Sequence, residues 1–417
     1  MHPRNPYRTP PDFAALAEHY PPLQQQSASG GPTIDFNDEQ AQRRLTEALL
    51  HRDFQLSVTI PDNRLCPPVG AFWQLNYILW IQDIISATAS DQNASVRGFD
   101  IGTGSSAIYP ILGCRLCPNW HFIGSDIDRD SLASARTNVE QNNLSDRIEV
   151  VEVSADGPIL RPLAVSRVTF DFTMCNPPFY SSAEDVARSA EVKEFQPNAV
   201  CTGADIEMIT EGGESHFVCR MVEESLALKD RCRWYTSMLG KLSSLTDVVS
   251  RLRSHSIDNY AITEFVQGQT RRWAVGWSFT GERLPDSLAR ISSPGVSSLM
   301  RPRNNLRQAL PDNPPPSALT EVLSSISGLT LSSTTQPITI SAQSNSWSRA
   351  ARRKQAAGAS GAPTPGPPLL VCRASVVQDD EGPAVVFVWA RGRERLAFEG
   401  FASHVAKKMR DMVRGGA

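Results

Sequence analysis

The sequence predicts an α/β protein with a mostly parallel, seven-stranded sheet that ends in an antiparallel hairpin. Between about residues 96 and 280, short runs rich in β-branched and aromatic residues alternate with longer amphipathic segments, the pattern of parallel strands joined by crossover helices. The last two runs are separated only by residues 268–272, a connection too short for a crossover and suited to a hairpin. The 417 residues also leave room for a second, smaller unit.

The elements of this sheet can be placed in order along the chain. After a basic, Pro-rich arm, helices are expected at 12–20 and at 37–52, where Asn37 or Asp38 can cap the first turn, and a third apolar segment at 75–85 leads into the first strand. Three helices between the strands are expected at 106–112, 130–142 and 214–227. The seven strands are expected at 97–101, 121–125, 148–153, 170–175, 233–239, 261–267 and 273–279.

We expect the chain to divide into four parts. These are an amino-terminal extension (1–95), the sheet domain (96–280), a linker rich in Pro, Ser and Arg (281–316) and a small α+β unit (317–417). The elements expected in the small unit are a helix at 318–326, strands at 336–342, 369–377 and 384–390, and a closing helix at 401–413. Its low-complexity segment 344–368 is expected to be disordered.

Composition and charge narrow the class of protein. Hydrophobic residues make up 41% and charged residues 20%, no apolar run approaches the length of a membrane span, and the amino terminus has no apolar signal core. We therefore expect a soluble protein of the nucleus or cytoplasm that is not secreted. Residues 286–417 carry 16 Lys and Arg against 9 Asp and Glu, whereas the first 285 residues carry 25 against 35. This basic tail favours a polyanionic partner.

The eight cysteines form no disulfide or metal framework. Cys114 and Cys117 are a lone C-x-x-C pair, without the second pair or the two histidines that a zinc site needs. We expect reduced, partly buried thiols and no metal.

A glycine-rich turn is expected after the first strand of the sheet, at Gly102 and Gly104. Glycines let the backbone bend sharply and approach a ligand closely. Asp126 ends the next strand, 24 residues after Gly102, where a carboxylate can accept ribose hydroxyls. A nucleotide-binding dehydrogenase or a plain tight turn offers the same pair of features. However, Asp100 can complement a cation and Ala107 replaces the third glycine of the dinucleotide fingerprint, so a sulfonium methyl donor is favoured.

The catalytic residues predicted from the sequence are Asn176, Pro177, Pro178 and Phe179, directly after the fourth parallel strand. An adenine amine is a poor nucleophile because its lone pair is delocalised into the ring. Two acceptors, the Asn176 side-chain oxygen and the Pro177 carbonyl, can hold its N–H groups and free that lone pair. The prolines fix the loop in advance, and Phe179 offers a face on which an extruded base can stack. A Pro-rich turn capped by Asn with a purely structural role is the alternative. The position of this segment, downstream of the glycine turn and the acidic residue, favours a catalytic role.

At these residues the sequence resembles the class I, Rossmann-like methyltransferases. More specifically, it resembles the U6 small nuclear RNA adenine-N6 methyltransferase family (methyltransferase-like protein sixteen and its orthologues), whose bacterial relatives methylate large-subunit ribosomal RNA. The resemblance covers about residues 1–280. The segments that carry it are 10–13, 75–80, 100–104, 138–146, 175–179, 211–214, 233–235, 238–241 and 272–274.

The resemblance implies S-adenosyl-L-methionine as cofactor and RNA as partner. The expected targets are an ACAGAG-like element of U6 RNA and structured messenger RNA hairpins. We expect a monomer that binds neither DNA nor membrane. The implied cofactor residues are Gln74, Asp100, Gly102, Gly104, Asp126, Asp156 and Asn176. The implied RNA contacts are Arg4, Asn5, Tyr7 and Arg272. The small unit, with basic clusters at 349–354 and 407–410, is compatible with a reduced form of the RNA-binding domain of larger family members.

The chain departs from the family at several positions. Gln74 stands where relatives have an arginine that touches the cofactor carboxylate, and Asp156 where they have a gating lysine. Pro6 and Gln269 replace arginines, and residues 192–198 lack an Arg-rich stretch. We expect these departures to change RNA affinity and specificity more than chemistry.

Three other functions remain open on sequence alone. Asn-Pro-Pro-aromatic loops also serve enzymes that methylate the glutamine amide of release factors, because a planar amide needs the same two acceptors. A non-catalytic RNA-binding factor could keep the fold. A nicotinamide dehydrogenase is a distant alternative, because its acid–base histidine beside a substrate arginine has no counterpart here.

Overall fold

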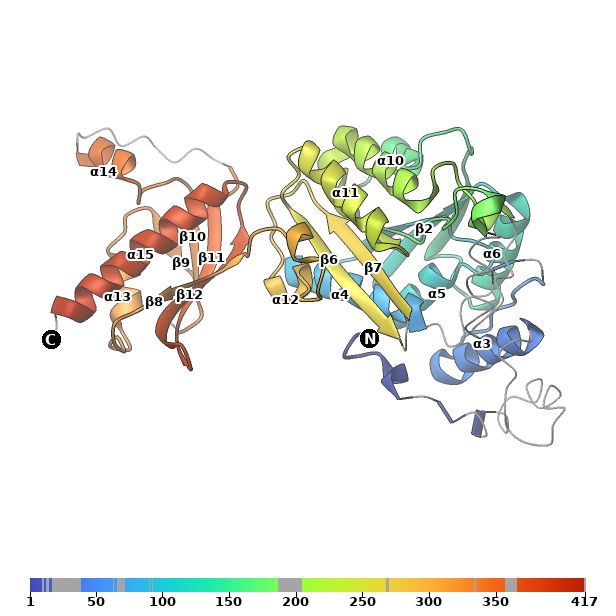
Figure 1. Ribbon diagram of the computed structural model, residues 1–417, viewed down its shortest axis with the longest axis horizontal. Coiled ribbons are helices and arrows are strands. Elements are labelled where there is room, and N and C mark those ends of the chain that lie inside the picture. The colour runs from blue at the N-terminus through green and yellow to red at the C-terminus, as the bar shows by residue number, and fades with distance from the viewer. Residues whose placement is uncertain are drawn as a thin grey trace. The chain divides into compact units, whose positions relative to one another are not determined.

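The computed structural model describes residues 1–9, 11–12, 15–16, 39–62, 64–65, 72–89, 91, 93–186, 205–267, 270–333, 335–356 and 366–415. The chain divides into two compact units: residues 1–279 with 291–299, and residues 280–290 with 300–417 (Figure 1). In the described part of the chain, every helix is too short or too polar to cross a membrane.

The first unit is built around a seven-stranded sheet of order β3-β2-β1-β4-β5-β7-β6. β1 to β5 pair in parallel, and β7 is antiparallel to both of its neighbours, so the predicted fold class is confirmed. The described hairpin ends leave only residues 268–269 between β6 and β7. The strands are β1 (Val96–Ile101), β2 (Trp120–Asp126), β3 (Ile148–Glu152), β4 (Phe170–Cys175), β5 (Cys232–Leu239), β6 (Tyr260–Gln267) and β7 (Thr270–Trp277).

Helices cover both faces of this sheet. α4 packs beside α5, and α10 beside α11, and Figure 1 shows these two pairs on opposite faces. The helices are α3 (Glu39–Phe54), α4 (Phe72–Thr88), α5 (Ile108–Leu116), α6 (Arg129–Gln141), α7 (Arg161–Val165), α9 (Asp205–Met208), α10 (Gly213–Leu228), α11 (Leu242–Ser254) and α12 (Asp286–Ala289), the last in the second unit. Most of the helix expected at 12–20 lies outside the described residues.

Local sequence explains where these helices begin and which face they bury. The Asp128 side chain caps α6 by accepting the Ser131 N–H at 2.8 Å. α11 was not predicted from the sequence, although Leu245, Val248 and Leu252 follow the helical repeat and are fully buried.

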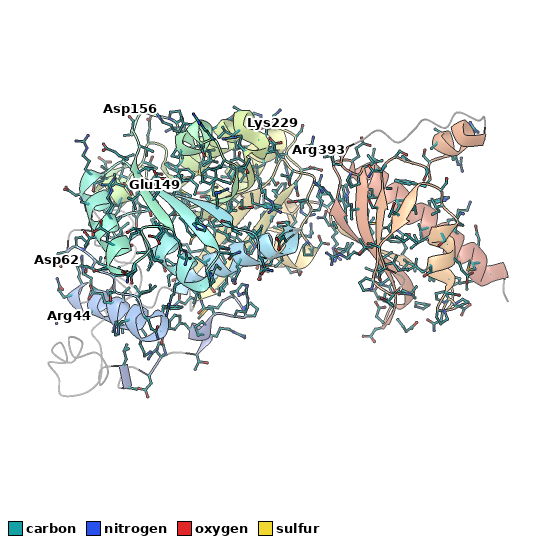
Figure 2. The ribbon with its side chains drawn as sticks, turned by 180° about the vertical axis from the view of Figure 1, so that it is seen from behind. Arg44, Asp62, Glu149, Asp156, Lys229 and Arg393 are labelled. Atoms are coloured by element: carbon teal, nitrogen blue, oxygen red, sulfur yellow. The ribbon has the colours of Figure 1, made fainter. Side chains whose placement is uncertain are left out.

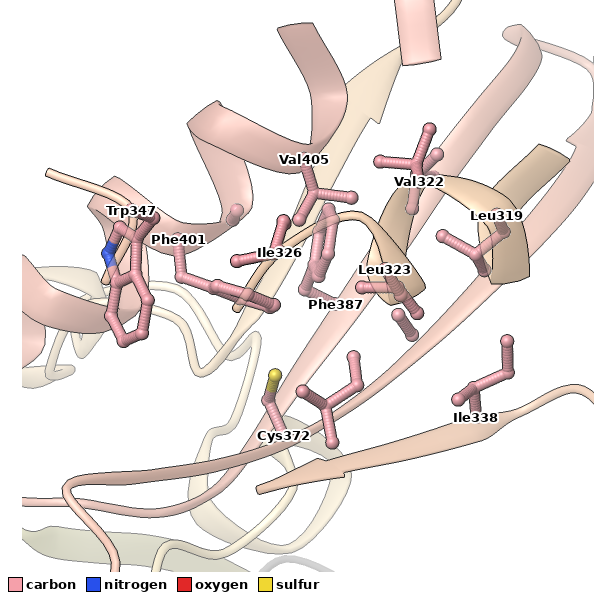
Figure 3. Packing of buried hydrophobic residues seen from close by; sticks show 14 of the residues in the cluster. Leu319, Val322, Leu323, Ile326, Ile338, Trp347, Cys372, Phe387, Phe401 and Val405 are labelled. Carbon is pink, nitrogen blue, oxygen red and sulfur yellow. The ribbon is translucent and has the colours of Figure 1, made fainter. Parts of the chain in front are cut away.

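The second unit is an antiparallel sheet of order β8-β12-β11-β10-β9 covered by helices, in agreement with the expected α+β class. In Figure 3, Ile338 and Phe387 of the sheet face Leu319 and Val322 of α13 and Val405 of α15. The elements are β8 (Asn305–Ala309), α13 (Ala318–Ser324), β9 (Leu329–Leu331), β10 (Ile338–Ala342), α14 (Arg349–Ala356), β11 (Leu370–Asp379), β12 (Gly382–Arg391) and α15 (Arg395–Gly415).

Two expectations for this part of the chain differ from the structure. The expected linker, 281–316, contains β8, which pairs with β12, because an unpaired β12 edge can accept a strand whose own sequence shows little alternation. The low-complexity segment 344–368 begins with the buried Trp347 and the helix α14, since an aromatic anchor orders the chain around it. Residues 357–365 of that segment lie outside the described residues.

Candidate functional site

The glycine turn and the Asn-Pro-Pro-Phe segment lie next to each other at one edge of the sheet. β1 and β4 pair in parallel, with Ile101 opposite Cys175. Gly102 and Asn176 are the next residues along each strand, so both leave the sheet at its carboxyl edge. In open α/β sheets this edge is where ligands bind.

The glycine turn has the geometry of a ligand cradle. Gly102 and Gly104 have φ values of +70° and +63°, in the left-handed region that favours glycine. A Cβ atom at Gly102 would have no atom within 4 Å, so the backbone there is open to a ligand. The Thr103 N–H donates to Ser125 O at 2.9 Å, and the Gly104 N–H to Asp126 Oδ2 at 2.9 Å. These two bonds tie the turn to the end of β2.

Two carboxylates make this edge electronegative. Asp100 is fully buried, and neither of its oxygens has a hydrogen-bond partner among the described residues. Burial, with a smaller contribution from the nearby Asp126 carboxylate, raises the pKa of Asp100 to about 7. Burial also raises the pKa of Asp126. Buried acids without a counter-charge fit a cationic ligand, such as the ammonium or sulfonium group of S-adenosylmethionine. The residues at this edge therefore suit that cofactor.

Asn176 carries an acceptor atom that no described residue uses. Its Oδ1 atom is buried and has no hydrogen-bond partner among the described residues. Pro177, whose carbonyl was predicted as the second acceptor, is buried as well. Tyr180 then forms a backbone bridge to a second segment, donating to Met208 O and accepting from the Thr210 N–H, both at 3.0 Å. The loop is thus held on both sides of the predicted catalytic residues.

Phe179 lies close to residues of β7, of α10 and of the turn after β5. The guanidinium carbon of Arg272, on β7, lies 5.2 Å from the centroid of the Phe179 ring. The buried Glu214, on α10, accepts the backbone N–H groups of Gly240 and Lys241 at 2.6 and 2.8 Å. A Cβ atom on Gly240 would lie 3.2–3.4 Å from atoms of Glu214, Arg272 and Phe179, so glycine allows their close approach.

Of the two predicted cofactor residues that depart from the family, Gln74 is buried and Asp156 is exposed. Gln74 lies in the first turn of α4, is 5% exposed, and its Oε1 atom has no hydrogen-bond partner among the described residues. Asp156 is exposed on the loop after β3, near the surface of the unit (Figure 2). A cofactor role for either residue stays a prediction.

Of the residues predicted to contact RNA in the amino-terminal arm, two are buried against the protein. The Asn5 Nδ2 atom donates to Asn76 Oδ1 at 3.0 Å, and the Tyr7 hydroxyl donates to Asp53 Oδ2 at 2.6 Å. Burial, reinforced by Asp53, raises the pKa of Tyr7 well above its usual range. Arg4 pairs with Asp83 of α4, and its side chain is 47% exposed. Of these three arm residues, only Arg4 exposes its polar side chain to solvent. RNA contact by Arg4, Asn5 and Tyr7 stays a prediction.

Several residues at this edge were missed by the sequence interpretation. Glu207 accepts the Leu65 N–H at 2.9 Å, and its Oε1 atom lies 4.0 Å from the position of a Cβ on Gly104. Tyr77 accepts the backbone N–H of Cys175, immediately before Asn176. A signal existed for Glu214, in the Glu-Gly-Gly-Glu segment at 211–214, and for Tyr77, in the family-like segment at 75–80. Glu207 reaches the edge from α9 and lies in none of the segments that carry the resemblance.

Other candidate sites are weaker. Two cavities of about 280 and 220 Å³ lie on either side of residues 114–118, between α5 and β2. That connection is at the amino end of β2, opposite to the ligand-binding edge. No cluster of metal-ligating side chains occurs in the described part of the chain. Cys114 and Cys117 are free and buried, and burial raises the pKa of each thiol to about 11.

Fold and site together define the class of protein. The strand order with its final antiparallel strand, the glycine turn, Asp126, and the Asn-Pro-Pro-Phe segment on the adjoining strand are those of a class I methyltransferase. A family model described as RNA methyltransferase matches residues 1–281. The chain belongs to this RNA methyltransferase family.

Similar proteins methylate adenosine in RNA, according to their names. The chain is 36% identical over 382 residues to the U6 small nuclear RNA (adenine-(43)-N(6))-methyltransferase of Schizosaccharomyces pombe. This match covers 91% of this chain and 95% of that protein. It is 44% identical over 286 residues to the RNA N(6)-adenosine-methyltransferase METTL16 of Homo sapiens, covering 67% of this chain and 50% of that protein. The chain thus spans about half the length of the vertebrate relatives it matches.

Solved structures match the first unit. The human METTL16 catalytic domain in complex with MAT2A 3′UTR hairpin 1 is 42% identical with a TM-score of 0.60, and the match covers 67% of this chain and 95% of that one. The N-terminal domain of human METTL16 in complex with SAH is 42% identical with a TM-score of 0.55, and the match covers 67% and 98%.

Proposed function

We propose that this chain is an S-adenosylmethionine-dependent RNA N6-adenosine methyltransferase. The observation that carries the proposal is the pairing of Ile101 with Cys175, because it sets the cradle at Gly102 beside the unpartnered Asn176 amide oxygen. The family membership and the SAH-bound human neighbour support the choice of cofactor. When bound, S-adenosylmethionine supplies an electrophilic methyl group.

The residues of this chain would hold the cofactor and prepare the amine. Asp100 and Asp126 provide negative charge and acceptors at the glycine turn, where Gly102 leaves room for a ligand. The Asn176 amide oxygen and the Pro177 carbonyl would accept the two N–H groups of an adenine amine. That arrangement draws the nitrogen toward tetrahedral geometry and makes its lone pair available. Proline rigidity lowers the cost of orienting the acceptors.

We propose U6 small nuclear RNA as the first target, with structured messenger RNA hairpins as further substrates. The similarity to the fission yeast enzyme over 91% of this chain supports U6, and the human complex with an RNA hairpin supports structured RNA. We also propose that the extension 1–95 and the basic second unit contribute to RNA binding. We propose further that the protein acts as a monomer, does not bind DNA and works in the nucleus.

Radiolabelled methyl transfer to total RNA, followed by mapping of the modified base, tests this function. We expect label on N6 of adenosine with the wild type and at least a hundredfold less with Asn176→Ala, because an acceptor acting in the transition state is lost. Asn142→Ala is a matched control, since Asn142 lies on the same unit and bonds Ser57 instead. Label on purified release factor with none on RNA would favour glutamine methylation. Equal phenotypes for Asn176→Ala and the wild type would favour a binding role.

A further inference from the structure

Tyr77 of α4 lies beneath the strand end that carries Asn176. It is fully buried, and its hydroxyl oxygen accepts the backbone N–H of Cys175 at 3.3 Å. The same oxygen lies 2.6 Å from Thr236 Oγ1 on β5. One side chain from outside the sheet therefore contacts both β4, which leads into the predicted catalytic loop, and the neighbouring strand β5.

Tyr77 acts where the backbone ladder between β4 and β5 stops. These two strands, described throughout, pair at Phe170 with Cys232 and at Phe172 with Trp234. Further along, the side chains of Thr173 and Thr236 replace the ladder. The Thr236 N–H donates to Thr173 Oγ1 at 3.0 Å, and Thr236 Oγ1 donates to Thr173 O at 2.7 Å. The carboxyl end of β4 is thus held on this side by hydroxyl groups.

The direction of each hydrogen bond in this chain follows from counting protons. A carbonyl can only accept, so the single proton of the Thr236 hydroxyl goes to Thr173 O. The Tyr77 hydroxyl must then donate to Thr236 Oγ1, which leaves its own oxygen to accept from Cys175. Burial raises the pKa of Tyr77 well above its usual range, so the hydroxyl keeps its proton. A satisfied, buried chain of this kind is rigid.

We propose that Tyr77 is a positioning residue for methyl transfer. By holding the Cys175 N–H, it sets how far Asn176 and Pro177 extend beyond the sheet edge, and hence where their two acceptor oxygens meet the amine. This inference rests on the proposed function of Asn176. Catalytic acceptors tolerate only about 0.5 Å of misplacement, so loss of the anchor reduces turnover more than binding.

Tyr77→Phe tests the role of the hydroxyl, because it keeps the ring and the volume. We expect kcat for methyl transfer to U6 RNA to fall about tenfold, while KM for RNA and for S-adenosylmethionine stays within about twofold. Tyr109→Phe is the matched control. Tyr109 is buried, its ring lies 5.9 Å from the Tyr77 ring, and its hydroxyl donates to Met238 Sδ at 3.4 Å, away from Cys175. This variant should keep at least half of wild-type kcat.

Variants of Thr236 test whether the chain acts as a unit. Thr236→Ser keeps the hydroxyl and should keep kcat within about twofold, whereas Thr236→Val should lower it as Tyr77→Phe does. The double variant Tyr77→Phe with Thr236→Val should lose little more than either single variant, because both break the same chain. Losses that multiply would contradict a shared role.

Hydrogen exchange of the Cys175 amide tests the anchor without any methyl transfer. We expect exchange in the free protein to become at least tenfold faster in Tyr77→Phe and to stay unchanged in Tyr109→Phe. If the wild type methylates no RNA but Cys175 responds in this way, the proposed function fails and the anchor stands. If Cys175 exchange or the kcat of an active enzyme is the same in Tyr77→Phe as in the wild type, the positioning role is wrong.

Discussion

The guanidinium of Arg272 lies over the ring of Phe179, with 5.2 Å between its carbon and the ring centroid. From sequence, Arg272 was expected to contact RNA and Phe179 to stack on a base. Their contact links the two roles, because a ring with one face against a guanidinium offers its other face in a defined orientation. A cation–π contact of this kind contributes about 0.5–1 kcal/mol at a partly exposed site.

Replacement of Arg272 should therefore affect turnover as well as RNA binding. We expect Arg272→Ala to lower kcat for RNA methylation about fivefold and to weaken RNA binding, while S-adenosylmethionine affinity measured by calorimetry changes less than twofold. Arg271→Ala removes the same charge from the neighbouring position, where the side chain is 52% exposed and pairs with Glu264. It should lower RNA affinity only modestly. Equal effects of the two variants on kcat would assign Arg272 to phosphate contact alone.

The buried Asp100 should make cofactor binding depend on pH. Its pKa of about 7 in the ligand-free protein means that the carboxylate is mostly protonated at pH 6 and mostly charged at pH 8. A cationic ligand prefers the charged form, so the dissociation constant for S-adenosylmethionine should fall about tenfold from pH 6 to pH 8. Calorimetry on Asp100→Asn supplies the control, and a pH profile in that variant identical to the wild type would rule out Asp100 as the source.

Stability of the ligand-free protein should show the opposite trend with the same group. A carboxyl whose pKa is higher in the folded state binds its proton more tightly there. Folding stability therefore falls as pH rises from about 4 to about 7 and is level above that range. Asp100→Asn should raise the melting temperature at pH 8, where the uncompensated charge costs up to a few kcal/mol. Unchanged melting at pH 8 would mean that the carboxylate is compensated.

The pairing of Arg4 with Asp83 predicts that Asp83 competes with RNA for the Arg4 guanidinium. Asp83→Asn removes the charged partner of Arg4, which keeps its bonds to Gln82 and to the Leu79 carbonyl, and of His2, whose Nε2 atom lies 2.9 Å from the same carboxylate. We expect RNA binding to become two- to fivefold tighter at low salt, and the amides of residues 1–9 to exchange faster. Asp91→Asn changes the same charge at an exposed position and controls for net charge. Weaker RNA binding in Asp83→Asn would show that the docked arm is the binding form.

The core of the second unit can be weakened without touching the site. Phe401 packs edge-on against Trp347 and Phe387, with ring centroids 5.1 and 6.1 Å apart (Figure 3). Phe401→Ala should lower the unfolding free energy of this unit by about 3–5 kcal/mol. S-adenosylmethionine affinity should stay within twofold. Leu396→Ala, on the same helix but 83% exposed, should change stability by less than about 0.5 kcal/mol. Equal unfolding curves for the two variants would contradict the assigned core.

Local sequence patterns predicted most of the fold and the position of the two central motifs of the candidate site. Strand and helix periodicity placed β1 to β7 within one to three residues, because alternation and chain reversal are encoded by neighbouring residues. It did not place β8, because a strand that pairs at an open edge with mixed polarity has little local signal. The proximity of the segment 176–179 to the glycine turn was predictable because both follow parallel strands, and the catalytic role of that segment stays a prediction.

The sequence by itself determined that a glycine turn, an acidic residue and an Asn-Pro-Pro-Phe segment stand at the ends of the first, second and fourth strands of a parallel sheet. Only the tertiary structure decided that Tyr77 anchors Cys175, that Glu214 holds Gly240, and that Asn5 and Tyr7 are buried. The physical reason is the separation along the chain. Tyr77 meets Cys175 and Thr236 across 98 and 159 residues, and such contacts depend on how helices pack on the sheet rather than on any local pattern.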